Sequence, residues 1–213
     1  MSARSRPRDE TPFEALLAHP VDAPLVHETR SSQAIGAPLI DEPLTDTTIG
    51  EALDLVLPLG EPYVHPTHGP IDDWDVSRVT DMGYMFLDES AFNSDLSSWD
   101  VSNVTNMKSM FSGATAFNGD LSRWNVGKVT NMQDMFSGAT AFESSPYGYD
   151  LRRWNVGKVK DMQSMFEMAV AFNSDLSRWN VSNVTNMDRM FAYAKAYKPR
   201  YALGSRVGGA RPT

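Results

Sequence analysis

Bulky apolar residues return at fixed intervals along most of this chain. The five tryptophans are separated by 25, 25, 30 and 25 residues; they are Trp74, Trp99, Trp124, Trp154 and Trp179. Ten of the twelve Met residues and nine of the ten Phe residues fall at fixed positions of the same frame. Such a period is typical of repeat architectures, in which each unit completes its core only against its neighbours. The pattern therefore predicts stacked units with one continuous core.

Within a unit, two patterns predict two kinds of element. The apolar core positions of the second unit are Trp99, Met107, Met110, Phe111, Ala114, Phe117 and Leu121. From the first Met to the second Phe, the spacing places these side chains on one face of a short helix. Asn106 precedes that segment and suits a helix N-cap. Residues 95–101 predict a short extended run that pairs in parallel with its counterparts. Each 25-residue unit is thus expected to hold a short helix plus a short parallel strand.

The composition changes on both sides of the repeats. Residues 1–45 hold six prolines among scattered charges and are expected to be extended or disordered. Residues 46–197 are expected to form the capped repeat array, with a helical spacing of Ile49, Leu53 and Val56 in its N-terminal cap. Residues 198–213 predict a basic, flexible tail.

The repeat phrase resembles a known family. The run from Trp99 to Phe111, WDVSNVTNMKSMF, is similar to the BspA-like leucine-rich-repeat surface proteins, in the branch with mycoplasma-lipoprotein-type repeats. The resemblance extends over about residues 65–197. It implies an α/β repeat solenoid that is leucine-rich-repeat-like and right-handed, with roles in adhesion and protein binding and no catalytic residues. The signal peptide of the surface members and the lipid-attached Cys of the lipoproteins are not visible, so we expect an intracellular location rather than the cell surface.

Charge and composition narrow the partners. The net charge of −8 argues against general nucleic-acid binding. No stretch of 18 apolar residues occurs, so no membrane insertion is expected. The charge is uneven, with acidic residues in excess over 1–70 and a basic end after Lys195.

An insertion of five residues lengthens one unit and is the best local candidate for partner binding. Insertions in repeat arrays lie in loops on one face, which is often the binding face. The candidate residues are Glu143, Pro146, Tyr147 and Tyr149. The alternative is a tolerated insertion without a role.

Other recurring polar residues have structural interpretations. The row of Asp95, Asp120, Asp150 and Asp175 suits turns in which the carboxylate accepts local N–H bonds, and calcium binding is the alternative. His65 and His68 are interpreted as residues of the cap. No catalytic triad, phosphate loop or zinc motif is visible, so we expect no catalytic residue, no metal site and no cofactor.

The sequence therefore predicts a non-enzymatic protein-binding solenoid with an extended recognition surface. One alternative is a structural or accessory subunit of a large assembly, whose tails wrap neighbouring subunits. A further alternative is a cell-surface adhesion protein.

Overall fold

A computed structural model describes residues 42–143 and 151–198. The chain divides into two units, residues 1–36 and 37–213, and every described residue belongs to the second. The expectations for the Pro-rich N-terminal segment and for the C-terminal tail therefore concern residues almost wholly outside the described ranges.

The described part begins with the helix α1, Asp46–Val56. Thr45 caps it, because its hydroxyl accepts a bond from the Thr48 N–H while the Thr48 hydroxyl accepts one from the Thr45 N–H. One face of the helix is buried through Ile49, Ala52, Leu53 and Val56. The helical spacing in the sequence corresponds to this face.

Short elements follow α1 and complete the N-terminal cap. A 3₁₀ turn, η1 (Leu57–Leu59), leads to the antiparallel pair β1 (Val64–His65) and β2 (Gly69–Pro70). The 3₁₀ turn η2 (Ile71–Asp73) then enters the first repeat. A third such turn, η3 (Leu151–Arg153), lies after the insertion.

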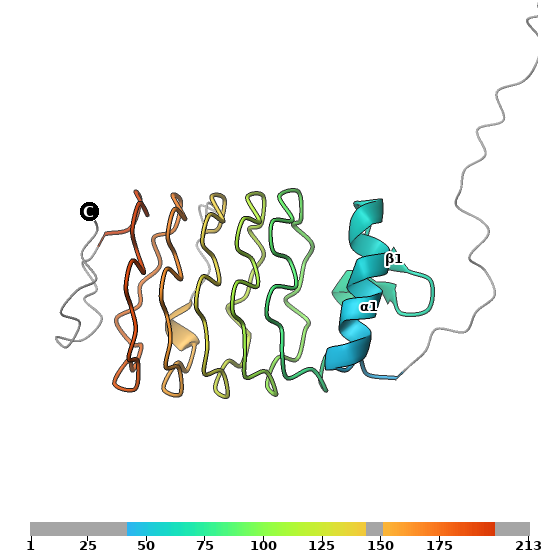
Figure 1. Ribbon diagram of the computed structural model, residues 1–213, viewed down its shortest axis with the longest axis horizontal. Helices are drawn as coiled ribbons and strands as arrows, with labels where there is room; N and C mark the ends of the chain where they lie inside the picture. Colours follow the sequence, from blue (N-terminus) through green and yellow to red (C-terminus); the bar gives the residue numbers. More distant parts are fainter. Residues whose placement is uncertain (1–41, 144–150, 199–213) are drawn as a thin grey trace, which may run out of the picture. The chain divides into compact units, whose positions relative to one another are not determined.

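The five repeats lie side by side in chain order (Figure 1). Single-residue parallel bridges join equivalent positions of successive repeats, namely Asp81, Asn106, Asn131, Asp161 and Asn186. Alternate backbone N–H groups then donate to carbonyls of the next repeat. In the second repeat the donors are Met107, Ser109, Phe111 and Gly113, and the acceptors, at 2.8–2.9 Å, are Asn131, Gln133, Met135 and Ser137. Backbone hydrogen bonds therefore join each repeat to the next.

The predicted fold class, an α/β repeat solenoid with a leucine-rich-repeat-like short helix plus short parallel strand in each unit, is wrong. Among the described residues the single α-helix is α1, which precedes the repeats, and the single sheet is the antiparallel pair β1 and β2. The segment from Met107 to Phe117 consists of turns, and residues 95–101 form no strand.

The physical reason is backbone conformation. An α-helix needs consecutive right-handed residues and N–H bonds to carbonyls four residues earlier. In the second repeat Ser109 has φ 53° and Gly113 has φ 74°, both left-handed. The N–H groups that a helix would use internally instead bond to the next repeat or to a carbonyl three residues earlier. The apolar side chains still lie on one side of the segment, and for this reason their spacing in the sequence matched that of a helix.

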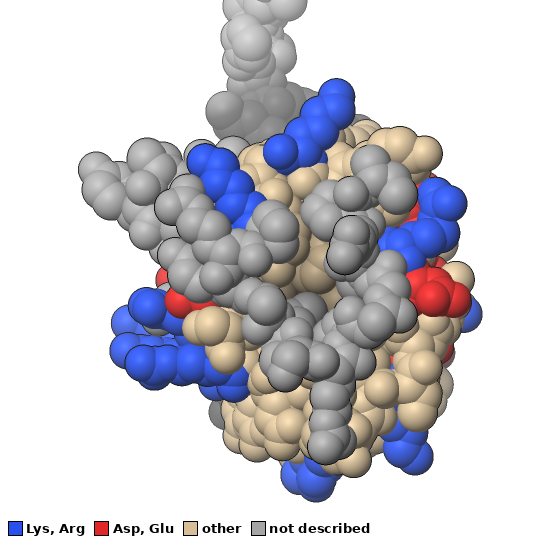
Figure 2. Space-filling model, turned by 90° about the vertical axis from the view of Figure 1, so that its left-hand side faces the viewer, with Lys and Arg blue, Asp and Glu red and all other residues tan. Residues whose placement is uncertain are grey.

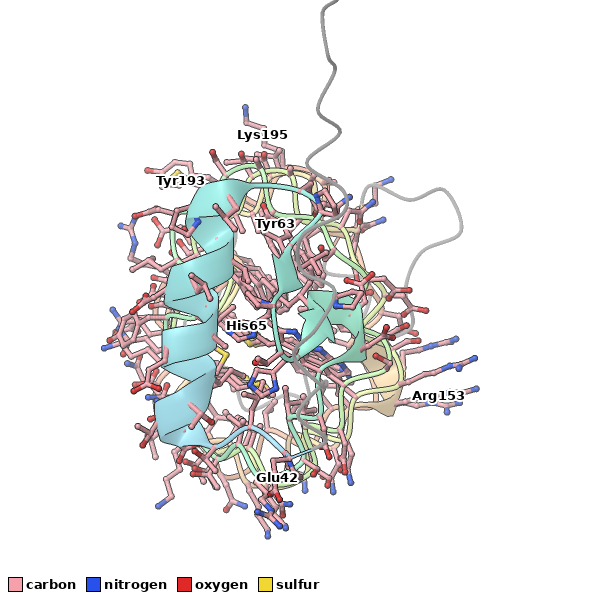
Figure 3. The ribbon with its side chains drawn as sticks, turned by 90° about the vertical axis from the view of Figure 1, so that its right-hand side faces the viewer. Glu42, Tyr63, His65, Arg153, Tyr193 and Lys195 are labelled. Atoms are coloured by element: carbon pink, nitrogen blue, oxygen red, sulfur yellow. The ribbon has the colours of Figure 1, made fainter. Side chains whose placement is uncertain are left out.

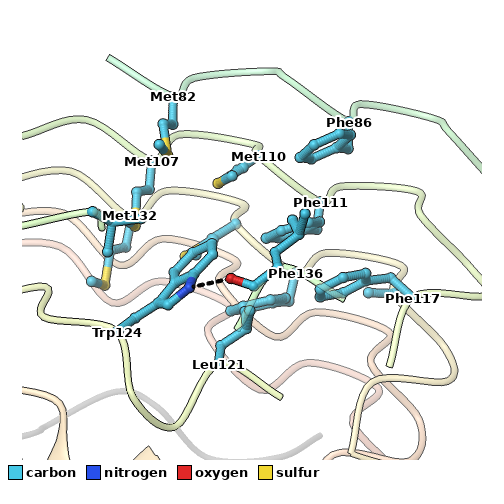
Figure 4. Close-up of a cluster of buried hydrophobic side chains, with 14 of the residues drawn as sticks. Met82, Phe86, Met107, Met110, Phe111, Phe117, Leu121, Trp124, Met132 and Phe136 are labelled. Carbon is cyan, nitrogen blue, oxygen red and sulfur yellow. Dashed lines mark hydrogen bonds between the residues drawn. The ribbon is translucent and has the colours of Figure 1, made fainter. Parts of the chain in front are cut away.

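The core lies inside the stack as columns of rings (Figure 4). The ring centroids of Phe111 and Phe117 lie 4.0 Å apart within one repeat, and those of Phe111 and Phe136 lie 5.6 Å apart across two. The Trp124 indole N–H donates to the Leu96 carbonyl at 3.0 Å, and Trp99, Trp154 and Trp179 make the corresponding bond to the element before their own repeat. The Trp74 indole N–H donates instead to the Gly69 carbonyl in the N-terminal cap, at 3.1 Å. Burial of the indoles thus leaves their polar group satisfied.

Candidate functional site

Every repeat contains two left-handed positions, and the residues at these positions differ between repeats. The first position holds Tyr84, Ser109, Asp134, Ser164 and Arg189. The second position holds Asp88, Gly113, Gly138, Met168 and Tyr193. Glycine adopts this conformation without a steric penalty, whereas bulky residues do so at a cost of about 1–2 kcal/mol each. The second and third repeats follow this preference at the second position, and the last two do not.

Met168 and Tyr193 form an exposed patch, which we call the Met–Tyr patch. Their side chains are 48% and 54% exposed. They occupy equivalent positions of neighbouring repeats, and the Met168 N–H donates to the carbonyl of Ala192, the residue before Tyr193, at 2.8 Å. Two large apolar side chains therefore occupy neighbouring surface positions where the second and third repeats have glycine.

A charged pair supports the backbone beside this patch. Glu167 is buried and accepts bonds from Arg189, one of them from Nε at 3.1 Å. The hydrogen bond from Arg189 outweighs desolvation and holds the pKa of Glu167 below its usual value. The carboxylate immediately before Met168 is thus fixed to the last repeat.

Basic side chains lie near the patch (Figure 3). Tyr193 lies at the outer edge of the stack, where Lys195 also projects outward (Figure 3). Lys and Arg side chains lie at several points around the C-terminal end of the repeats, with some Asp and Glu among them (Figure 2). A partner that covers the Met–Tyr patch would therefore meet apolar surface with basic groups beside it.

Of the four residues predicted in the insertion, Glu143 alone lies within the described ranges. Its carboxylate is buried and accepts bonds from the Asn173 N–H at 3.3 Å and from the Ser174 hydroxyl. Asn93 occupies the same position two repeats earlier, and its side chain accepts the Asn118 N–H at 2.7 Å. Glu143 therefore joins two repeats as asparagine does elsewhere. Pro146, Tyr147 and Tyr149 lie outside the described residues, and partner binding by this group stays a prediction.

Burial changes the acidity of Glu143. Desolvation raises its pKa from 4.5 to about 7, against the lowering effect of the bonds from Ser174 and Asn173. The group serves the contact between repeats, because its bonding partners are backbone and hydroxyl groups of the next repeat.

The recurring Asp residues make the local turns expected of them. Asp95, Asp120 and Asp175 each accept the N–H of the residue two positions later, at 2.9 Å. Asp150 lies outside the described ranges. Asn106, predicted as a helix N-cap, likewise accepts the N–H of Lys108 at 3.1 Å in a turn. Repeated polar residues of these rows thus shape turns.

The histidines lie beside the first tryptophan. The Nδ1 atom of His65 accepts the Thr67 N–H at 3.2 Å and the His68 N–H at 3.3 Å. Desolvation and the nearby His68 lower the pKa of His65. Within residues 42–143 and 151–198, no cluster of three His, Asp or Glu side chains is arranged to hold a metal ion.

The ten residues predicted as repeat core all lie in one buried cluster. They are Trp74, Trp99, Trp124, Trp154, Trp179, Met107, Met110, Phe111, Phe117 and Leu121. Each is at most 4% exposed, so none is available to a partner on the surface.

Comparison with known proteins gives one family. The family described as Mycoplasma protein of unknown function, DUF285, matches residues 64–152 and 143–202, which together exceed half of the chain. The chain belongs to this family. No curated protein and no solved structure matches it. In the described part, no helix is long and apolar enough to cross a membrane.

Proposed function

We propose that this protein is a non-enzymatic protein-binding module that contacts its partner along the outer edge of the last repeats. The observation that supports this proposal is the Met–Tyr patch. Exposed aromatic and Met side chains are enriched at protein interfaces, and strained backbone persists at sites where a function requires it. The equivalent glycines Gly113 and Gly138 show that the repeat itself does not require Met or Tyr at this position.

The test separates binding from stability. The full chain and its Met168→Gly/Tyr193→Gly variant are immobilised and exposed to an extract of the native source, and captured proteins are quantified by mass spectrometry. Because glycine removes left-handed strain but gains chain entropy when unfolded, the free energy of unfolding should be unchanged or rise by up to about 1 kcal/mol. We expect the specific companions to fall at least about ten-fold, equivalent to 1.4 kcal/mol.

The matched control is Leu55→Ser/Leu59→Ser, which removes two exposed apolar side chains at the other end of the repeats. This control should keep the companions. Retention of the same companions by the glycine variant, or their equal loss in the control, would contradict the proposal for the Met–Tyr patch.

Two further functions follow from the sequence and remain proposals. An accessory role in a large assembly predicts that the native protein is recovered at the mass of a complex. An adhesion role, which the resemblance to BspA-like surface proteins supports, predicts the mature protein outside the cell. Native mass measurement and cell fractionation distinguish these from a freely exchanging binding module.

A further inference from the structure

A groove runs along the surface between α1 and the first repeat. It has a volume of about 460 Å³. One wall is a stripe of α1 that includes Ile49, Gly50 and Asp54, and the other includes Gly83 and Met85 of the first repeat. A Cβ atom at Gly50 would meet nothing within 4 Å, so this glycine opens the wall of the groove. Figure 3 faces this end of the molecule, with α1 along one side.

The wall formed by the first repeat carries backbone carbonyls that accept no hydrogen bond from any described residue. In the interior, the corresponding carbonyls of Lys108 and Met110 accept the N–H groups of Tyr84 and Phe86 at 2.8 and 2.9 Å. The first repeat has no repeat before it. Among the described residues, no N–H or O–H group donates to the carbonyl of Gly83 or of Met85. An extended peptide in the groove could supply these N–H donors, as in strand addition to a sheet edge.

The groove is also acidic. Its lining contains Asp46, Asp54 and Asp81 and no Lys or Arg. Asp46 already accepts bonds from Thr80 and Asp81, whereas no partner of the Asp54 carboxylate lies within the described part. An extended segment with positive side chains therefore matches both the acceptors and the charge of the groove.

The opposite end of the stack has the complementary chemistry. The N–H groups of Met187, Arg189, Phe191 and Tyr193 occupy the positions that elsewhere donate to a following repeat, and they have no acceptor in the described ranges. The sequence beyond this end is basic, with Lys195, Lys198, Arg200, Arg206 and Arg211 and no Asp or Glu from residue 195 onward.

We propose that the groove binds the basic C-terminal segment, residues 198–213, of a second copy of this chain. In a head-to-tail contact, the start of that segment lies beside the next copy's groove. Within one copy, the same segment would have to run back along all five repeats. In such a head-to-tail contact, the copy at one end of the assembly still has an empty groove and the copy at the other end still has a free C-terminal segment. Further copies can therefore add as the protein concentration rises.

The experiment uses full-length variants and measures mass against concentration by sedimentation. Gly50→Trp fills the groove, and Arg200→Ser/Arg206→Ser/Arg211→Ser removes the charge of the C-terminal segment. Wild type should self-associate with rising concentration, and each variant should associate at least about ten-fold more weakly. A mixture of the two variants should form a heterodimer and stop there, because the mixture contains one intact groove type and one intact segment type.

Controls keep the result independent of folding. Gly50→Ala improves the helix propensity of α1 and leaves the groove open, so it should associate as wild type does. Leu55→Trp places the same bulk on the exposed face of α1 and should also associate normally. Asp54→Arg should weaken association, and more so at low salt.

Three results would overturn the proposal. They are a wild type that stays monomeric at all concentrations, a Gly50→Trp variant that assembles as wild type does, and a variant mixture that forms no heterodimer. The first of these includes the case in which the segment folds back into its own groove. The Met168→Gly/Tyr193→Gly variant should self-associate as wild type does. Failure of the self-association proposal therefore leaves the proposed function untouched, and the reverse also holds.

Discussion

The first and last repeats carry the same apolar residues at three positions after the tryptophan but bury them to different extents. In the first repeat, Val76, Val79 and Met82 are 1%, 0% and 0% exposed. The counterparts in the last repeat are packed against the core but only partly buried; they are Val181, Val184 and Met187. The residue types are identical at all three positions.

The difference lies in what covers each end. The buried face of α1 joins the same apolar cluster as the first repeat, and the Asp46 carboxylate accepts the Thr80 and Asp81 N–H groups. Beyond the last repeat, no described element supplies an equivalent layer. Burial in this protein is therefore set by the neighbour of a repeat more than by its own sequence, as expected when units complete their cores only by stacking.

The largest effect is expected when one phenyl ring is removed from the middle of the repeat stack and, in a second variant, one from its C-terminal end. Phe136 is fully buried, with ring contacts to Phe111 and Phe166 on either side. Phe136→Ala should lower the free energy of unfolding by about 3–5 kcal/mol, because a cavity opens between two layers. Phe191 has a repeat on one side only among the described residues. Phe191→Ala should cost at least about 1 kcal/mol less, since the end can relax around the cavity.

Urea unfolding of both variants provides the measurement, with equal m-values required for the comparison. Equal losses would show that the end is as well packed as the middle, and the role assigned to neighbouring repeats would then be wrong.

The sequence predicted the period and the positions of the core side chains because Trp, Met and Phe recur without change. It did not predict the backbone. Helical and turn-based segments can place Met107, Met110 and Phe111 on one side, and periodicity alone does not separate them. A signal was available in the glycines at 113 and 138, since two repeats have glycine at a position inside the supposed helix.

The two candidate surfaces were harder to predict, for different reasons. The Met–Tyr patch could have been found by asking which residues replace the aligned glycines, because Met168 and Tyr193 are the apolar replacements. The groove beside α1 depends on how a helix packs against a repeat 30 residues later, and no local pattern encodes that contact. Glu143 was predicted to face a partner, but its burial depends on the next repeat.

The second test concerns Glu143, a buried carboxyl at a position where other repeats have asparagine. Its pKa is 4.5 when unfolded and about 7 when folded, so the folded state holds the proton more tightly. The contribution of this group is favourable below pH 4.5 and is lost as the pH rises to about 7. The loss amounts to at most about 3.5 kcal/mol, at about 1.4 kcal/mol for each pKa unit.

Glu143→Gln should abolish this pH dependence and Glu143→Asn, which restores the residue of the other repeats, should do the same. The measurement is the free energy of unfolding of wild type and variants between pH 4 and 8. A wild-type curve parallel to that of Glu143→Gln would place the carboxyl in water and contradict its burial by the next repeat.

The smallest expected effect comes from a valine substitution at equivalent positions of the first and last repeats, which compares the two ends directly. Val79→Ala removes two fully buried methyl groups from the first repeat and should cost about 2 kcal/mol, from about 0.8 kcal/mol for each buried carbon plus the cavity. Val184→Ala removes the same atoms from the partly exposed counterpart, and should cost about half as much or less. If self-association through the C-terminal segment covers the last repeat, the cost of Val184→Ala should rise with protein concentration, while that of Val79→Ala stays constant. Equal costs at low concentration would mean that the last repeat is already covered within the monomer, and the asymmetry between the two ends would disappear.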